Sequence, residues 1–183
     1  MSNLLPNTKE VAPNVYYTTD TVVCFDRECI AFLKERAQQA QQRRARLCAH
    51  TSPDATHHSM LIVTRGDGIF PPHRHTKKAE TMTVIEGSAD ALLFDESGTA
   101  TKTIHMSPPQ DGGVFSYYMP ADIYHTILPR SDWYVFIETT QGPFEEAGMD
   151  TPLWGPNVDD PDECERWRAQ CESAVSTLSE NES

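Results

Sequence analysis

The sequence predicts an all-β fold, in which one domain forms a double-stranded β-helix, or jelly-roll barrel. A helix precedes the barrel, and a helical, acidic tail follows it. Between about residues 47 and 140, short β-prone runs alternate with turn residues, which is typical of a sandwich or barrel. Helical periodicity is confined to the segments on either side. A chain of 183 residues is long enough for one sizeable core.

The N-terminal segment predicts an arm followed by a helix. Its β-prone runs before residue 25 indicate an edge strand or an extended arm. Asp26 is a suitable N-cap, and we expect the helix to run from there to about Arg46. Ile30, Leu33 and Ala37 recur at helical spacing and predict its apolar face.

The central region predicts enough strands for a jelly roll, which has about eight. We expect these strands near residues 59–64, 69–75, 80–85, 89–95, 101–106, 115–119, 125–128 and 133–139. Gly98 marks a hairpin turn between two of them. Alternation along the strands should turn one side chain in two toward an interior pocket.

The chain after residue 140 is rich in proline and glycine, which predicts a segment laid over the barrel. Residues 163–178 predict a last helix, whose face with Trp167 and Cys171 should dock on the domain. We expect the last five residues to be disordered. The predicted parts are the arm and helix at 1–47, the barrel with its covering segment at 48–158, and the acidic tail at 159–183.

Charge and cysteine content limit the functional classes. The net charge of −12 argues against nucleic acid or an anionic membrane surface as a partner. Much of this charge is local, because residues 157–183 carry eight acidic residues against two arginines. The five cysteines form no CxxC pair, and the first residues do not resemble a secretory signal. We therefore expect reduced thiols and a cytoplasmic protein, with a homodimer left open.

Four residues predict a site for one divalent metal ion. His73 and His75 are two apart, so both side chains lie on one face of a strand. Glu80 follows a short polar turn, which allows it to fold back beside them. His125 is the natural fourth ligand. Three imidazoles and one carboxylate make a mixed nitrogen and oxygen site with open coordination positions. We favour Fe2+, with Mn2+, Ni2+ and Zn2+ as alternatives.

These residues also match the motifs of the cupin superfamily, which the chain resembles. His73, His75, Glu80 and Gly87 fill the first cupin motif without a spacing error. Pro120 and His125 match the second motif, while Asp122 and Pro129 replace its glycine and its asparagine. The glycine that should open the first motif falls at Asp67, between two glycines.

A narrower resemblance covers roughly residues 26–157 and is to the WbuC-type cupin-fold metalloproteins. The matching pieces keep their order: Arg44, Arg46, His50, Ser52-Pro53, Met60-Leu61-Ile62, Pro72 to His75, Lys78, Glu80, Leu93-Phe94-Asp95, Gly98, Tyr124-His125, Ser131-Asp132, Glu138-Thr139, Gly142-Pro143-Phe144 and Trp154-Gly155-Pro156. The first 25 residues and the acidic tail depart from it. The resemblance implies a cytoplasmic metal-binding cupin, often encoded among genes for O-antigen or other surface polysaccharide. It implies no particular reaction.

Two functions follow from these residues. The first is a mononuclear metal enzyme, an oxygenase or an isomerase or lyase, that acts on a small anionic or sugar-linked metabolite. The second is a non-catalytic cupin that binds metal and ligand in a sensing or regulatory role.

Arg44, Arg46 and His50 predict a binding site for the charged end of an anionic ligand, because an arginine fork fits a carboxylate or phosphate. The alternative for the arginines is a role at the helix end, where cations complement the dipole. A helix there would splay Arg44 and Arg46 by roughly 200°. Of the other candidates, we expect His57 and His58 to be exposed, and Tyr117 or Tyr118 to point inward.

Overall fold

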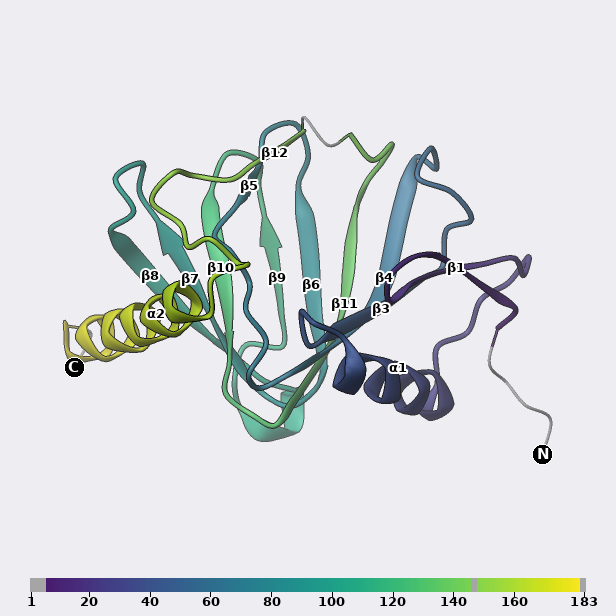
Figure 1. Ribbon diagram of the computed structural model, residues 1–183, viewed down its shortest axis with the longest axis horizontal. Coiled ribbons are helices and arrows are strands. Elements are labelled where there is room, and N and C mark those ends of the chain that lie inside the picture. Colours follow the sequence, from purple (N-terminus) through teal and green to yellow (C-terminus); the bar gives the residue numbers. More distant parts are fainter. Residues whose placement is uncertain (1–5, 146–147, 182–183) are drawn as a thin grey trace.

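A computed structural model describes residues 6–145 and 148–181 (Figure 1). The chain is mostly β-sheet, with one helix before the barrel and one after it, as predicted. No helix in these two ranges is long and apolar enough to span a membrane. The elements are β1 (Thr8–Ala12), β2 (Val15–Thr18), α1 (Arg27–Gln39), β3 (Arg44–Cys48), β4 (His57–Arg65), β5 (Arg74–His75), β6 (Glu80–Glu86), β7 (Ala89–Phe94), β8 (Ala100–Met106), a 3-10 turn (Pro109–Asp111), β9 (Ser116–Met119), β10 (Tyr124–Pro129), β11 (Trp133–Gln141), β12 (Met149–Asp150) and α2 (Pro161–Asn181).

The strand order of β4 to β11 is that of a jelly roll. One sheet contains β4, β11, β6 and β9 as neighbours, and the other contains β10, β7 and β8. Just before β5, an antiparallel bridge between His73 and His125 places this segment beside β10 of the second sheet, while β5 itself pairs with β12. The chain thus crosses between the sheets as a jelly roll does. The predicted strands coincide with these elements. Only β5 is much shorter than expected, because Pro71 and Pro72 cannot donate backbone hydrogen bonds.

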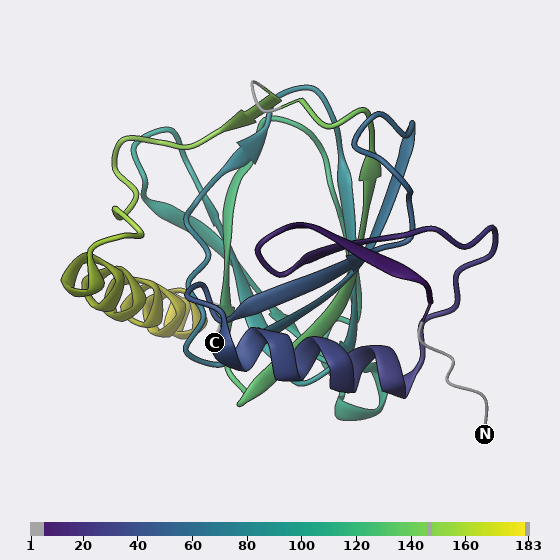
Figure 2. The same cartoon turned by 45° about the vertical axis from the view of Figure 1, so that its right-hand side comes forward.

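The first sheet continues beyond the barrel. β3 pairs with β4, β2 runs parallel to β3, and β1 closes the edge as an antiparallel partner of β2. The predicted N-terminal arm is therefore a hairpin added to the sheet. α1 packs on the outer face of this extension, where Leu33 and Ala37 are fully buried against Ala45 and Leu47 (Figures 1 and 2).

The helix boundary at Asp26 is confirmed, but the predicted end near Arg46 is wrong. The Asp26 side chain accepts hydrogen bonds from the backbone N–H groups of the first turn, as an N-cap does. The helix ends at Gln39, and Arg43 has a left-handed φ of 54°. From Arg44 the chain is a strand hydrogen-bonded to β4. Pairing with the sheet overrides the helical propensity of the arginines and glutamines.

α2 covers the outer face of the second sheet (Figure 1). Trp167 and Cys171 are buried there against Leu92, Phe94 and Tyr124. The predicted docking face is therefore present, and Glu165 and Glu172 of the same helix are exposed. The main core lies between the two sheets and is lined by alternate residues of their strands.

Candidate metal centre

The four predicted ligands come from two facing sheets. His73 and His125 are directly paired, because each donates its backbone N–H to the carbonyl of the other, at 3.0 and 2.9 Å. His75 ends β5, two residues beyond His73. Glu80 begins β6 in the opposite sheet, and Thr140 of β11 is its partner in register. The carboxylate therefore faces the imidazoles across the interior.

Distances divide the four ligands into a compact triplet and one neighbour. One ligand atom from each of His73, Glu80 and His125 lies within 4.8 Å of the others. His125 Nε2 lies 3.2 Å from Glu80 Oε1, and His75 Nε2 lies 3.2 Å from Glu80 Oε2. His75 thus adjoins the group through Glu80 but is outside the triplet.

Two of the imidazoles are held by backbone carbonyls of their own segments. His73 Nδ1 lies 3.1 Å from the Pro71 carbonyl oxygen, and His125 Nδ1 lies 2.9 Å from that of Ile123. A carbonyl only accepts, so each Nδ1 carries a hydrogen and donates it. This leaves both Nε2 atoms available as ligands, an arrangement typical of metal-bound histidine.

A sharp turn aims His125 at the site. Asp122 replaces the glycine of the second cupin motif, yet it has a left-handed φ of 66°. Aspartate tolerates this conformation better than most residues. The backbone N–H of Asp122 donates to the His75 carbonyl oxygen at 2.8 Å, which fixes the turn against β5. Gly87 of the first motif also has a positive φ, and a Cβ there would lie 2.0 Å from the Trp133 carbonyl oxygen.

Burial and the neighbouring imidazoles act in opposite directions on the charge of Glu80. Burial favours the neutral acid, but hydrogen bonds from His125 and His75 outweigh it and lower the pKa of Glu80 well below its usual value. Burial opposes a charge on His125 as well, yet the Glu80 carboxylate raises the pKa of that imidazole. Burial, followed by the neighbouring His125, lowers the pKa of His73 to about 4. Glu80 therefore stays ionised at neutral pH, as a metal-binding carboxylate must be.

The residues present fit a divalent metal. His75 Nδ1 is buried and has no hydrogen-bond partner among the described residues, which leaves one imidazole nitrogen unused by the protein. The Tyr117 hydroxyl donates to Glu80 Oε1 at 2.8 Å and orients the carboxylate. Nitrogen and oxygen ligands of this kind suit Fe2+, Mn2+, Ni2+ and Zn2+. Tyr117 is thus the inward-facing residue of the pair left open, and Tyr118 is exposed.

Glu138 is an interior residue that the site prediction missed. Tyr134 and Phe136 of β11 belong to the core between the sheets, and alternation places Glu138 on the same face. Burial, and then the charge of Glu80, raise the pKa of Glu138 to about 7, although His75, Arg46 and Arg44 oppose this shift. The alternation within the strand at 133–139 was the signal that could have identified it.

The structure places Arg44 and Arg46 on one side of β3, so the expected helical splay is wrong. Ala45 and Leu47 pack under α1. Because side chains alternate along the strand, Arg44 and Arg46 lie on its other face, toward the interior of the barrel. The Arg44 guanidinium lies 4.7 Å from the centre of the Phe70 ring. Its burial, followed by the charge of Arg46, lowers its pKa to about 10. The Arg46 side chain is exposed, whereas the Arg44 side chain is half-buried.

His50 follows β3 and stacks on a second histidine. Its ring centre lies 4.0 Å from that of His58, with the planes 6° apart. His58 is 3% exposed, so its expected exposure is wrong, because alternation along β4 turns it inward. Burial, and then His58, lower the pKa of His50 to about 4. His50 is therefore a neutral group at neutral pH.

Comparisons with known proteins find one matching family model and several similar solved structures. A family model described as "Domain of unknown function (DUF6016)" matches residues 25–106. No curated protein matches the chain. The similar solved structures include an oxalate decarboxylase from Bacillus subtilis, with a TM-score of 0.44 and 22% identity over 59% of this chain and 27% of that one. They also include the capsular polysaccharide assembling protein CapF from Staphylococcus aureus, with a TM-score of 0.44 and 16% identity over 55% of this chain and 28% of that one.

Another similar structure is procruciferin, an 11S globulin from Brassica napus, with a TM-score of 0.43 and 12% identity over 52% of this chain and 23% of that one. This chain spans about a quarter of the length of each of these proteins. The jelly roll itself rests on the strand order of this chain.

Proposed function

We propose that the protein is a mononuclear metal-dependent cupin of the WbuC type that acts as an enzyme on a small anionic or sugar-linked metabolite. One observation carries the proposal: two imidazoles, oriented through Nδ1 by backbone carbonyls, stand with a third around one buried carboxylate. The proposed ligands are His73, Glu80 and His125, with His75 as the fourth. Fe2+ is the favoured metal.

Access to the centre supports catalysis over a purely structural metal. Glu80 and His125 are buried, whereas His73 and His75 keep solvent contact. A ligand can therefore approach from the side of these two imidazoles. A bound divalent metal supplies Lewis acidity toward a carbonyl or enediol, or a coordination position for dioxygen. Both an oxygenase and an isomerase or lyase fit this chemistry.

The interior residues around β3 indicate the charge of the substrate. Arg44 and Arg46 lie on the face of β3 opposite α1, Arg44 half-buried and Arg46 exposed, and neither forms an ion pair with a described residue. We assign the anionic end of the substrate to these arginines and to His50. Glu138, with a pKa near 7, is suited to hold or release a proton beside the substrate. By its resemblance, the protein acts in the cytoplasm and in surface polysaccharide biosynthesis.

Metal analysis followed by turnover assays tests the proposal. The metal content of freshly purified protein should approach one ion per chain. After anaerobic reconstitution with Fe2+, oxygen uptake and product formation are measured on sugar nucleotides and small oxo-acids. Turnover that disappears in Glu80→Gln and persists in His105→Ala supports the enzyme, because His105 is an exposed histidine outside the site. Tight ligand binding without turnover supports a sensing role instead.

A further inference from the structure

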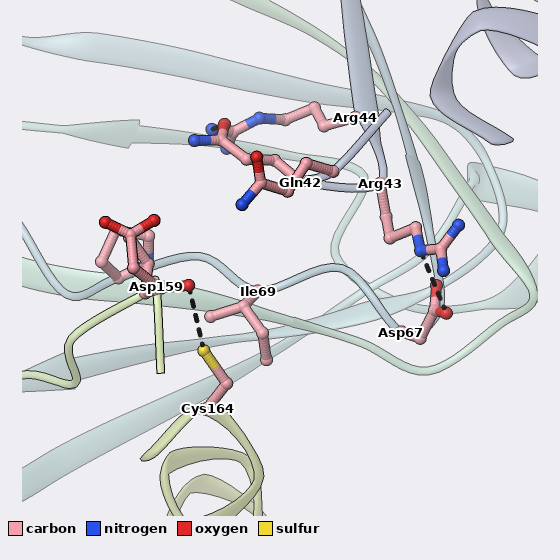
Figure 3. A pocket seen from close by; sticks show the side chains of 10 residues that line it. Gln42, Arg43, Arg44, Asp67, Ile69, Asp159 and Cys164 are labelled. Carbon is pink, nitrogen blue, oxygen red and sulfur yellow. Dashed lines mark hydrogen bonds and ion pairs between the residues drawn. The ribbon is translucent and has the colours of Figure 1, made fainter. Parts of the chain in front are cut away.

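A pocket of about 280 Å³ lies where β3 begins and contains none of the four proposed metal ligands (Figure 3). Three segments far apart in the sequence form it: the end of the α1–β3 loop, the stretch that precedes β5, and the start of the C-terminal tail. Its lining residues are Gln41, Gln42, Arg43, Arg44, Asp67, Ile69, Pro71, Val158, Asp159 and Cys164.

Arg44 is a charged residue of this pocket whose guanidinium forms no ion pair with a described residue. Arg43 lies 3.7 Å from the Asp67 carboxylate and donates to the Gln38 carbonyl oxygen. Arg44 donates only a long hydrogen bond of 3.4 Å to the Gln42 side chain, and no carboxylate of the described residues forms an ion pair with it. Glu138 is near enough to act on the charge of Arg44, but no carboxylate of the described residues contacts its guanidinium, so the pocket favours an anionic group beside Arg44.

The opposite wall has the reverse charge. Figure 3 shows Asp159 and Cys164 across the hollow from Arg44 and Gln42. The Asp159 carboxylate forms no ion pair with a described residue, and only its backbone N–H is engaged, by Asn157. A carboxylate only accepts hydrogen bonds, so it suits a ligand group that donates them, a hydroxyl or an ammonium. Ile69, Pro71 and Val158 provide apolar contact between the two ends.

We propose that this pocket binds a small carboxylate that carries hydroxyl or ammonium groups at its other end. The ligand carboxylate pairs with Arg44, and its donors face Asp159. This inference rests on the proposed function for Arg44 as an anion-binding residue. It extends that function by making the C-terminal tail part of the ligand site. Binding requires no metal, because no lining residue is a proposed metal ligand.

Two probes test the site in protein stripped of metal: gluconate, which carries hydroxyls, and γ-aminobutyrate, which carries an ammonium. Glucitol is the matched control for gluconate, since it lacks the carboxylate. Titration followed by calorimetry or NMR should show saturable binding of at least one probe and none of glucitol. Arg44→Met should weaken that binding at least about tenfold, the usual effect of removing a charged hydrogen-bond partner. Arg44→Lys should retain part of it.

Two further variants separate the pocket from its surroundings. Asp159→Asn should weaken binding of the probe that binds and leave hexanoate, which lacks polar donors, unaffected. Arg65→Met is the matched control, because Arg65 pairs with Asp67 but does not line the pocket. It should leave probe binding unchanged. Circular dichroism and thermal unfolding verify that each variant is folded.

The inference is overturned if neither probe binds, or if Arg44→Met binds them as tightly as the original chain. It is also overturned if Arg65→Met weakens binding as much as Arg44→Met does. Because these titrations need no metal, failure of the proposed metal function appears separately, as absent metal or absent turnover in a chain that still binds the probes.

Discussion

The metal centre and the arginine region of β3 differ in whether the protein supplies partners for its own charged groups. At the metal centre, the buried Glu80 is surrounded by His125, His75 and the Tyr117 hydroxyl, all within hydrogen-bond distance. On β3, Arg44 is half-buried and Arg46 is exposed on the same face, and neither forms an ion pair with a described residue. At the metal centre the protein itself supplies all the ligands, and only the metal ion comes from outside. The arginine region is incomplete until an anion arrives from outside.

At the metal centre the fold provides the counter-charges, whereas at β3 a ligand has to provide them. Alternation along strands produces both groups, since each lies on the inward face of its strands. The acidic group keeps its own counter-charges nearby and is suited to a small cation. The basic group is suited to a larger molecule that brings negative charge with it. The predictions below test each side of this comparison.

The largest effect is expected from His125→Ala. It removes one of the three closely grouped ligands and leaves Glu80 buried with one fewer partner. Metal affinity should fall by more than about a hundredfold, the upper effect of losing a supporting residue around a metal. The melting temperature of the metal-loaded protein should fall with it. Metal analysis and thermal unfolding measure both. Full metal occupancy in the variant would exclude His125 as a ligand.

The second prediction concerns acid stability of the protein without metal. The folded pKa of His50, about 4, lies below its ordinary value of 6.5, so the unfolded chain takes up the proton first as pH falls. Stability should therefore decrease between about pH 6.5 and 4, by at most about 3 kcal/mol from this group. His73, whose pKa is also about 4, adds to the loss.

His125 has the opposite sign. Its raised folded pKa stabilises the metal-free protein below pH 6.5, and this contribution is lost as pH rises through the folded value. Urea unfolding at pH 7 and pH 5 should show a smaller acid loss in His50→Phe than in the original chain. Equal losses in both proteins would mean that His50 does not titrate in this way.

A moderate effect is expected from Tyr117→Phe. The variant removes the hydroxyl that donates to Glu80 and keeps the buried ring. Metal affinity should fall by about tenfold, in the range seen for groups that orient metal ligands. Tyr118→Phe is a matched control, because Tyr118 is 69% exposed on the other face of the strand. A competition titration with a chelator compares the two variants, and equal affinities would contradict the assigned role.

The smallest effect is expected from Arg46→Lys, which keeps the charge but loses the guanidinium fork. Affinity for the anionic substrate, once identified by the turnover assays, should fall by roughly threefold to tenfold. Metal content should stay the same, because Arg46 is not a ligand. Unchanged affinity would leave Arg46 without a part in substrate binding.

Much of the fold and of the metal centre could be predicted because both depend on local patterns. The strands were visible from short β-prone runs between turn residues, and His73, His75, Glu80 and His125 match spaced motifs. The structure places His73, Glu80 and His125 within one compact group.

The missed features depend on pairing across the chain. Arg44 and Arg46 have helix-compatible side chains, and pairing with β4, and for Arg46 also with β2, makes them strand residues. His58 looked exposed because its position is set by pairing with Thr140, far along the chain. Glu138 was part of a piece that matches the family resemblance, but no site was predicted there, since an acidic residue inside a core is uncommon.

At both His73 and His125, Nδ1 donates a hydrogen bond to the carbonyl oxygen two residues earlier. The orientation of each imidazole therefore depends on only three consecutive residues. Each histidine carries its own orienting group within a tripeptide, Pro-Pro-His or Ile-Tyr-His. A substitution elsewhere in the barrel can shift these strands without changing the tautomer that each one presents. The pair should therefore be transplantable: the two tripeptides, bridged in the same antiparallel register on another sheet, would supply two correctly protonated imidazoles to a designed metal site.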